Sequence, residues 1–271
     1  MKIAKNFFSH FLIAIGAISA FIGAFSWLAG YSSSVQLIIS FGIIIVGVAY
    51  ALFQIYPPQK IKLFANHSFP IYIEEGDLFN QKGVIIIPVN EYFDTIVDDK
   101  IIASNTIHGK FVDKLFKSRI IDLDAEIAHE LESIESEENS ERAQGNTKRY
   151  PLCTCISIED GGNVYILVAL TNFDEHNKAS IPMQEYGSII QKVIIKASTV
   201  ANSRPVYMPL LGSGQGGIKK PAQRILFYII SQIEFSTEVS IPEGLHIVIY
   251  KLSDKGINLD DIKSAWQSAI K

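Results

Sequence analysis

Two uncharged apolar stretches at the N-terminus, Phe7–Leu28 and Val35–Tyr56, constrain this chain more than any other feature. A helix of about 22 residues reaches about 33 Å, enough to cross the roughly 30 Å hydrocarbon core of a bilayer. The alternatives are a cleaved signal peptide, whose apolar region is usually shorter, and a buried core hairpin, whose helices would show a polar face. We therefore predict a two-helix transmembrane hairpin over residues 1–58.

The basic residues around the two stretches predict their orientation. Lys2 and Lys5 precede the first stretch, Lys60 and Lys62 follow the second, and the loop Ala29–Ser34 carries no charge. Basic residues favour the cytoplasmic side, so both termini are expected in the cytoplasm. The expected location is the inner or plasma membrane.

Small residues recur along both stretches and would let helices approach closely. Gly16, Ala20 and Ala24 are spaced four apart in the first stretch, and Gly47 and Ala51 form a matching pair in the second. These faces would either close the hairpin on itself or join protomers. Because neither stretch contains Asp, Glu, Lys or Arg, the pair is expected to be an anchor or an assembly surface.

The remainder of the 271 residues fits one domain. Pro57-Pro58 ends the second stretch, residues 59–68 are expected to be a juxtamembrane connector, and residues 69–271 a globular domain. A net charge of −4 argues against nucleic acid as a partner. The acidic run Glu126–Glu141 predicts an amphipathic helix that frays into Ser136–Asn146.

The two cysteines, Cys153 and Cys155, have no neighbouring zinc ligands, so no metal site is expected. They are expected to be reduced and to point to opposite faces of a strand.

Beyond Ser68, short β-branched runs alternate with amphipathic stretches, which is typical of an α/β domain. The predicted strands are Phe69–Glu75, Gly83–Asn90, Tyr150–Glu159, Asn163–Thr171, Pro205–Leu211 and Leu245–Leu252. The predicted helices are His108–Lys117, Leu123–Ile134, Pro182–Ala201, Pro221–Glu234 and Leu259–Ile270, the last with Asn258 as its cap. The turn Asp160-Gly161-Gly162 indicates a hairpin, so we expect an α/β/α domain with a mixed central sheet.

A glycine-rich loop between a predicted strand and a predicted helix is a candidate phosphate-binding loop. Its glycines would let backbone N–H groups turn toward an anion without interference from Cβ atoms. The loop matches neither the Walker pattern nor the complete dinucleotide fingerprint, and a plain turn is the alternative. Its residues are Gly212, Ser213, Gly214, Gln215, Gly216 and Gly217.

Two polar residues follow the first two strands of the predicted domain. Asp77 could accept a hydrogen bond from an exocyclic amine of adenine, and Asn90 could bond ribose hydroxyls. The alternative is that both are turn or cap residues.

Taken together, these residues resemble the macrodomain, the ADP-ribose-binding fold, because the Gly76-Asp77-Leu78 turn, the strand ending in Asn90 and the Gly-Ser-Gly loop occur in that family's order. More specifically, the chain resembles the macro-like effectors of Thoeris antiphage systems that carry two N-terminal transmembrane helices. The motifs that carry this resemblance are Val89–Thr95, Val97–Lys100, Ile107–Lys110 and Leu211–Gly214.

The resemblance implies a receptor and not an enzyme. A TIR-domain partner makes an ADP-ribose-derived signal from NAD, in some systems conjugated to histidine. The macro-like domain then binds this signal, assembles as a homo-oligomer and damages the lipid bilayer. No cofactor or catalytic residue is expected. Family hydrolases carry a small-residue and glycine run where this chain has Glu91–Asp94, and a membrane-tethered ADP-ribosyl hydrolase is the alternative.

The same resemblance assigns ligand contacts. Asp77 and the Leu78 backbone would lie at the adenine, Asn90 at the distal ribose, and Gly212–Gly217 around the diphosphate. Ile218 and Lys219 stand where macrodomains often place a stacking aromatic residue, so Phe93 or Phe173 would have to take that role.

Three carboxylates and one histidine complete the predicted site. Asp94, Asp98 and Asp99 would pair with a cationic amine on a conjugated group, or else lie in water as loop residues. His108 would either begin a helix or contact the ligand through its ring.

Overall fold

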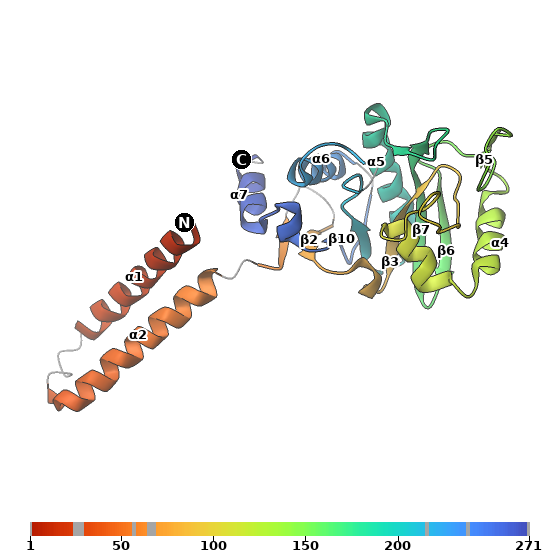
Figure 1. Cartoon of the computed structure of the whole chain (residues 1–271). Helices are drawn as coiled ribbons and strands as arrows, with labels where there is room; N and C mark the ends of the chain where they lie inside the picture. The colour runs from red at the N-terminus through yellow and green to blue at the C-terminus, as the bar shows by residue number, and fades with distance from the viewer. Residues whose placement is uncertain are drawn as a thin grey trace. The chain divides into compact units, whose positions relative to one another are not determined.

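The computed structural model describes residues 2–23, 30–55, 58–63, 69–214, 217–236 and 239–269. It divides into two compact units, Met1–Pro58 and Gln59–Lys271. Figure 1 shows the elements of both units.

The first unit consists of two helices that pack against each other, α1 (Lys2–Gly23) and α2 (Ser33–Ile55). Gly47 of α2 faces α1, because a Cβ atom at this position would lie 3.2 Å from the Cγ1 atom of Ile15. Gly16 of α1, in contrast, is exposed and would have no atom within 4 Å of its Cβ. Gly47 thus belongs to the face that closes the hairpin and Gly16 to an outward face. Ala24 lies outside the described residues.

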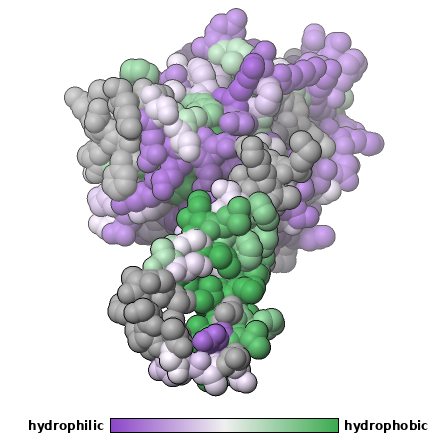
Figure 2. Space-filling model, turned by 90° about the vertical axis from the view of Figure 1, so that its left-hand side faces the viewer, coloured by the Kyte–Doolittle hydropathy of each residue, from purple (hydrophilic) through white to green (hydrophobic). Residues whose placement is uncertain are grey.

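The surface of the first unit is largely apolar, as Figure 2 shows in green. In α2, Leu37 and Ile38 are each 71% exposed and Phe41 is 67% exposed. Residues Ser34–Leu52 form a segment long and apolar enough to cross a membrane. The apolar segment described in α1, Phe7–Ala20, is shorter, and residues 24–29 of the first predicted span lie outside the described residues.

The second unit is built on a mixed sheet with the strand order β1-β2-β10-β9-β3-β7-β6, as predicted in type. Five neighbouring strands, β2, β10, β9, β3 and β7, run parallel, and the outer strands β1 and β6 run antiparallel to their neighbours. The short β8 pairs with β7. The strand bounds are β1 Lys60–Leu63, β2 Ile71–Glu75, β3 Val84–Asn90, β6 Cys155–Asp160, β7 Asn163–Phe173, β8 Ala179–Ser180, β9 Val206–Pro209 and β10 Leu245–Ile249.

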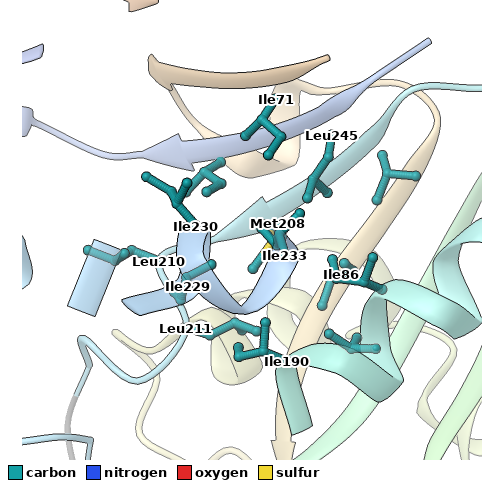
Figure 3. Close-up of a cluster of buried hydrophobic side chains, with 14 of the residues drawn as sticks. Ile71, Ile86, Ile190, Met208, Leu210, Leu211, Ile229, Ile230, Ile233 and Leu245 are labelled. Atoms are coloured by element: carbon teal, nitrogen blue, oxygen red, sulfur yellow. The ribbon is translucent and has the colours of Figure 1, made fainter. Parts of the chain in front are cut away.

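Helices cover both faces of this sheet and enclose two hydrophobic clusters. The first cluster contains side chains of α5 (Met183–Val200), α6 (Ala222–Glu234) and α7 (Leu259–Ala269), and Figure 3 shows its centre. The second lies under α3 (Ile107–Phe111), the π-helix η3 (Val112–Phe116) and α4 (Ile120–Leu131). In β3, Ile86 belongs to the first cluster and Ile85 and Ile87 to the second. β3 is therefore a central strand buried on both faces.

The sheet begins earlier than predicted, because β1 lies in the segment expected to be a connector. Its residues alternate between exposed lysines and the buried Ile61 and Leu63, which are 5% and 2% exposed. This period of two is a strand signal. The alternation covers only four residues, which is why the sequence predicts a juxtamembrane connector over residues 59–68. Residues 64–68 lie outside the described residues.

Two other local predictions need correction. The polar stretch after α4 is not a frayed helix end, because Glu137–Glu138 (β4) pairs with Lys148–Arg149 (β5) in a two-stranded ladder. Cys153 lies before β6 with a φ of 71°, so it is not on a strand, and both cysteines pack against the first cluster. They are free thiols.

One predicted cap is confirmed. Asn258 accepts hydrogen bonds from the N–H groups of Asp260 and Asp261 at 2.9 and 3.3 Å at the start of α7.

Candidate ligand-binding site

The carboxyl ends of the five parallel strands meet at one edge of the sheet, where α/β folds commonly bind ligands. Asp77 follows β2, Tyr250 follows β10, and Asn90 ends β3. The glycine loop begins just after β9, which lies between β10 and β3. The structure therefore brings the three predicted motifs to a common edge.

Asp77 lies in a tight turn at one end of this edge. Its Oδ1 accepts a hydrogen bond from the Phe79 N–H at 3.0 Å and caps a 3-10 turn, η2 (Leu78–Asn80). Its Oδ2 lies 3.5 Å from the ammonium of Lys114, and the side chain is 33% exposed. Leu78 is buried in the second cluster and anchors the turn. Asp77 is thus a cap residue that leaves part of its carboxylate open to solvent.

Tyr250 is a site residue that the sequence analysis missed. The Gly76 N–H donates to the Ile249 carbonyl at 3.1 Å, which ties the start of the Asp77 turn to the end of β10. The next residue, Tyr250, is 63% exposed, and the ammonium groups of Lys110 and Lys251 lie 6.0 and 5.4 Å from its ring centre. The predicted strand runs to residue 252, which places Tyr250 inside it, whereas β10 ends at Ile249. An aromatic residue at the true strand end was the available signal.

The glycine loop has one position that only glycine can occupy. A Cβ atom at Gly217 would lie 2.2 Å from the Gly212 carbonyl oxygen, so the two arms of the loop touch through their backbones. Gly212 itself has a φ of +73°, which favours glycine. Gly214 is exposed and a Cβ atom there would meet nothing within 4 Å. Gln215 and Gly216 lie outside the described residues.

Hydrogen bonds hold the base of this loop. The hydroxyl of Tyr186 in α5 donates to the Leu211 carbonyl at 2.9 Å, and that of Ser213 donates to the Leu210 carbonyl at 2.7 Å. The Ile218 N–H closes the loop onto the Gly212 carbonyl at 2.8 Å. The described parts of the loop on both sides of residues 215–216 are therefore anchored.

Asn90, at the end of β3, is 2% exposed and has partners inside the protein. Its Nδ2 donates to Asp94 at 3.0 Å, and its Oδ1 accepts from the N–H groups of Tyr92 and Asp94 at 3.0 and 3.4 Å. These bonds fold residues 90–94 into a tight turn. Asn90 is thus a turn residue in this structure. A contact with a ribose would need its side chain to exchange these hydrogen-bond partners.

Asp94 pairs with Arg142 of the same chain, so it is not a loop carboxylate in water, and its pairing with a cationic amine of a ligand stays a prediction. The guanidinium of Arg142 donates to both of its carboxylate oxygens, at 3.1 and 2.7 Å. The two side chains are 1% and 6% exposed. Arg142 was missed because it lies 48 residues further along the chain, inside a polar stretch. No local pattern marks it.

His108 lies in the first turn of α3, where Thr106 is the N-cap and accepts from the Gly109 N–H at 3.0 Å. The helix-start interpretation is confirmed, and the imidazole also contacts the backbone of Asp94. Burial lowers the pKa of His108 from 6.5 to about 4, and the nearby Asp94 only partly opposes this shift. His108 is therefore neutral at pH 7.

Asp98 and Asp99 organise their own exposed loop. Asp98 accepts from the N–H groups of Lys100 and Ile101, and Asp99 from that of Ser104 at 2.7 Å. These backbone donors lower the pKa of both carboxyl groups. Their hydrogen-bond partners lie within residues 98–104, which fits the interpretation as loop residues.

Phe93 does not offer a ring face to a ligand in this structure. It is 1% exposed and packs edge-on against Tyr150, with ring centres 5.7 Å apart. Phe173 is half-buried, and its ring centre lies 5.9 Å from the Arg142 guanidinium. The Phe93 ring is therefore covered in this structure, and its predicted stacking on a ligand stays a prediction. Tyr250 offers the exposed ring instead.

The chain is similar to known proteins over most of its second unit. The model of the family "Thoeris protein ThsA, Macro domain" matches residues 71–250. The Thoeris protein ThsA of Bacillus amyloliquefaciens (strain Y2) is 31% identical over 239 residues, which cover 84% of this chain and 77% of that protein.

Among solved structures, two mutants of the Oceanobacillus iheyensis macrodomain match with a TM-score of 0.53 at 12% identity. They cover 77% of this chain and 98% and 94% of their own. At this identity they show the fold alone. The sheet, its two helical layers and the glycine loop form a macrodomain, and the chain belongs to the Thoeris ThsA macro-domain family.

Proposed function

We propose that this chain is a membrane-anchored receptor of antiphage defence that binds an ADP-ribose-derived signal made by a TIR-domain protein. The observation that carries the proposal is the glycine loop, which is anchored at its base and open at Gly214. It lies between the Asp77 and Asn90 ends of the strand edge. A backbone loop of this kind suits a diphosphate placed between two groups that are recognised separately.

The two ends of the edge suit the two ends of such a ligand. Tyr250 can stack on a flat base while the free part of the Asp77 carboxylate accepts from its amine. The lysines beside Tyr250 add positive charge near the phosphates. The distal ribose and any group attached to it would then lie toward Asn90 and Asp94.

We further propose that the ligand is bound and left intact. A general base needs a free acceptor within reach of a water molecule. The Asp94 carboxylate already accepts from Arg142, Asn90 and the Asn146 N–H. Glu91 is 4% exposed and accepts from the Phe173 N–H. The membrane-tethered hydrolase is the alternative outcome of the test below.

The apolar hairpin would turn binding into membrane damage. α2 is long and apolar enough to span a bilayer, and in the proposal α1 spans it too, with both termini in the cytoplasm. Signal binding would favour an assembly of protomers. Moving such an equilibrium from 1:99 to 99:1 needs about 10⁴-fold tighter binding to the assembled state, which several protomers can supply jointly.

Ligand titration of the full-length chain in detergent tests the binding step. ADP-ribose should bind saturably to the wild type, and Gly214→Val should abolish this binding without loss of folding. The space around Gly214 accepts a side chain in the free protein, but a diphosphate would need the same volume. Equal affinity of the two chains would place the ligand elsewhere.

Dye entry into cells that contain an activating TIR-domain partner tests the membrane step. Removal of residues 1–58 should abolish dye entry. Gly16→Leu, on the outward face of α1, should suppress it if protomers assemble there, whereas Gly47→Leu tests the face that closes the hairpin. Killing by a chain that lacks residues 1–58 would contradict the proposal.

A further inference from the structure

Three polar side chains, one from each of the strands β1, β2 and β10, form a connected network. Glu74 of β2 is its centre. The Glu74 carboxylate accepts a hydrogen bond from the Lys60 ammonium of β1 at 2.7 Å, and it lies 2.9 Å from Nδ1 of His246 in β10. Because the three strands are neighbours in the order β1-β2-β10, the network ties one edge of the sheet together.

The network is largely shielded from solvent. His246 is 7% exposed, and the ring centres of Tyr72 and Tyr207 lie 4.5 and 4.7 Å from its own. The Glu74 side chain is 14% exposed. Burial raises the pKa of the Glu74 carboxyl, but hydrogen bonds from His246 and Lys60 outweigh this effect and lower the pKa. The carboxylate is therefore ionised at pH 7 and has two partners.

The strands of the network lead to both functional parts of the chain. Asp77 follows β2 and Tyr250 follows β10 at the candidate site. On the other side, residues 56–59 separate α2 from the start of β1. The carbonyl of Gln59 accepts from the Glu75 N–H at 2.8 Å, so the chain is already tied to β2 just before β1 begins. The network thus connects the strands of the site to the strand that follows the hairpin.

We infer that this network couples the ligand site to β1, so that signal binding stabilises the pairing of β1 with the sheet. The inference rests on the proposed function, because it takes a ligand to contact both Asp77 and Tyr250 and so to join the ends of β2 and β10. Among the described strands, β1 is four residues long and pairs with β2 alone. A short edge strand of this kind opens more readily than the centre of a sheet.

The coupling has a consequence for assembly. A ligand that binds more tightly while β1 is paired shifts the opening equilibrium of β1 by that difference in affinity. The segment that leads into α2 is then already ordered before protomers meet. Assembly no longer has to order this segment, so it becomes more favourable without any new contact between protomers.

Hydrogen exchange of the full-length chain in detergent tests the coupling, with and without saturating ADP-ribose. In the wild type, ADP-ribose should slow exchange of the β1 amides about fivefold or more, and that of β6, the strand at the opposite edge, much less. Bound ADP-ribose that slows neither edge strand, or both equally, overturns the coupling. If ADP-ribose does not bind at all, the proposed function fails and the coupling with it.

A pair of variants tests whether the network carries the coupling. Lys60→Met removes the ion pair to Glu74, whose side chains are 46% and 14% exposed. Arg119→Met is the matched control, because it removes an ion pair of similar exposure, 45% and 22%, to Asp160 at the end of β6.

Lys60→Met should bind ADP-ribose as tightly as the wild type, because Lys60 contacts no part of the ligand in the proposal. Its β1 amides should exchange about threefold faster without ligand, and ADP-ribose should slow them less than about twofold. Arg119→Met should behave like the wild type in β1. Full slowing by ADP-ribose in Lys60→Met, or its loss in both variants, overturns the role of the network.

Discussion

The two ends of the candidate site differ in how far they are open. At the Asp77 end, the carboxylate is 33% exposed and the neighbouring Tyr250 ring is 63% exposed. At the Asn90 end, Asn90 and Asp94 are 2% and 1% exposed and bonded within the protein. The end that in our proposal holds the nucleotide part of a ligand is exposed to solvent. The end that would contact a group attached to the distal ribose is closed by contacts within the protein.

The ion pairs at the two ends differ in the same way. Asp77 and Lys114 lie 3.5 Å apart at the surface, where such pairs contribute little to stability. Asp94 and Arg142 are almost fully buried, where loss of one partner leaves an uncompensated charge. Substitutions at the closed end should therefore act on folding, and those at the open end on binding.

The largest expected effect comes from Asp94→Ala. It leaves the buried Arg142 without its carboxylate, so the free energy of unfolding should fall by about 3–5 kcal/mol. Denaturant unfolding measures the loss. Asp98→Ala is the matched control, because that exposed carboxylate bonds only within its own loop, and it should change stability little. Similar stability of the two variants would remove the contrast between the two ends.

For the glycine loop we predict a second, smaller difference in stability, between substitutions at Gly217 and Gly214. Gly217→Ala should lower the free energy of unfolding by about 1–3 kcal/mol, because its Cβ atom would overlap the Gly212 carbonyl oxygen. Gly214→Ala should stay within about 0.5 kcal/mol of the wild type. Thermal unfolding of both variants checks this order. A stable Gly217→Ala would mean that the two arms of the loop do not touch.

His108 predicts a dependence of stability on pH. Its pKa is lowered from 6.5 to about 4 in the folded chain, so its contribution is complete above pH 6.5 and is lost as the pH falls toward 4. Between pH 7 and pH 5 the loss should be on the order of 2 kcal/mol. His108→Gln should be less sensitive to pH over this range, as measured by denaturant unfolding at each pH. Parallel curves for the two chains would show that His108 is not buried against Asp94.

The smallest effects on folding, with clear effects on binding, are expected at the open end. Asp77→Ala and Tyr250→Ala should each weaken ADP-ribose binding by about 1–3 kcal/mol, through a lost hydrogen bond and a lost stacking surface. Calorimetry of the full-length chain measures both. Tyr250→Phe keeps the ring and should bind like the wild type. If Tyr250→Phe were as weak as Tyr250→Ala, stacking would not be the role of this residue.

The sequence predicted the fold well where the signal was local and periodic. The β-branched run Gly83–Asn90 was predicted correctly as a strand, and the glycine loop was placed correctly between a strand and a helix. The strand β1 was missed because its alternation spans only four residues beside a pair of prolines.

The closed end of the site could not be predicted because it depends on contacts between distant segments. Asp94 was expected to pair with a cationic amine of a ligand, and nothing near residue 142 indicates that Arg142 bonds to it. Tyr250 was missed because the predicted strand ends at residue 252, three residues after the true end of β10. Ion pairs across 48 residues and exact strand ends are the features that a local pattern does not carry.

The most direct test of the central claim is long incubation of the full-length chain with ADP-ribose, followed by chromatography of the ligand and calorimetry of the same sample. We expect saturable binding, its loss in Gly214→Val, and recovery of unchanged ADP-ribose. Absence of binding, or steady conversion of the ligand to smaller products, would contradict the proposal that this receptor binds its signal and leaves it intact.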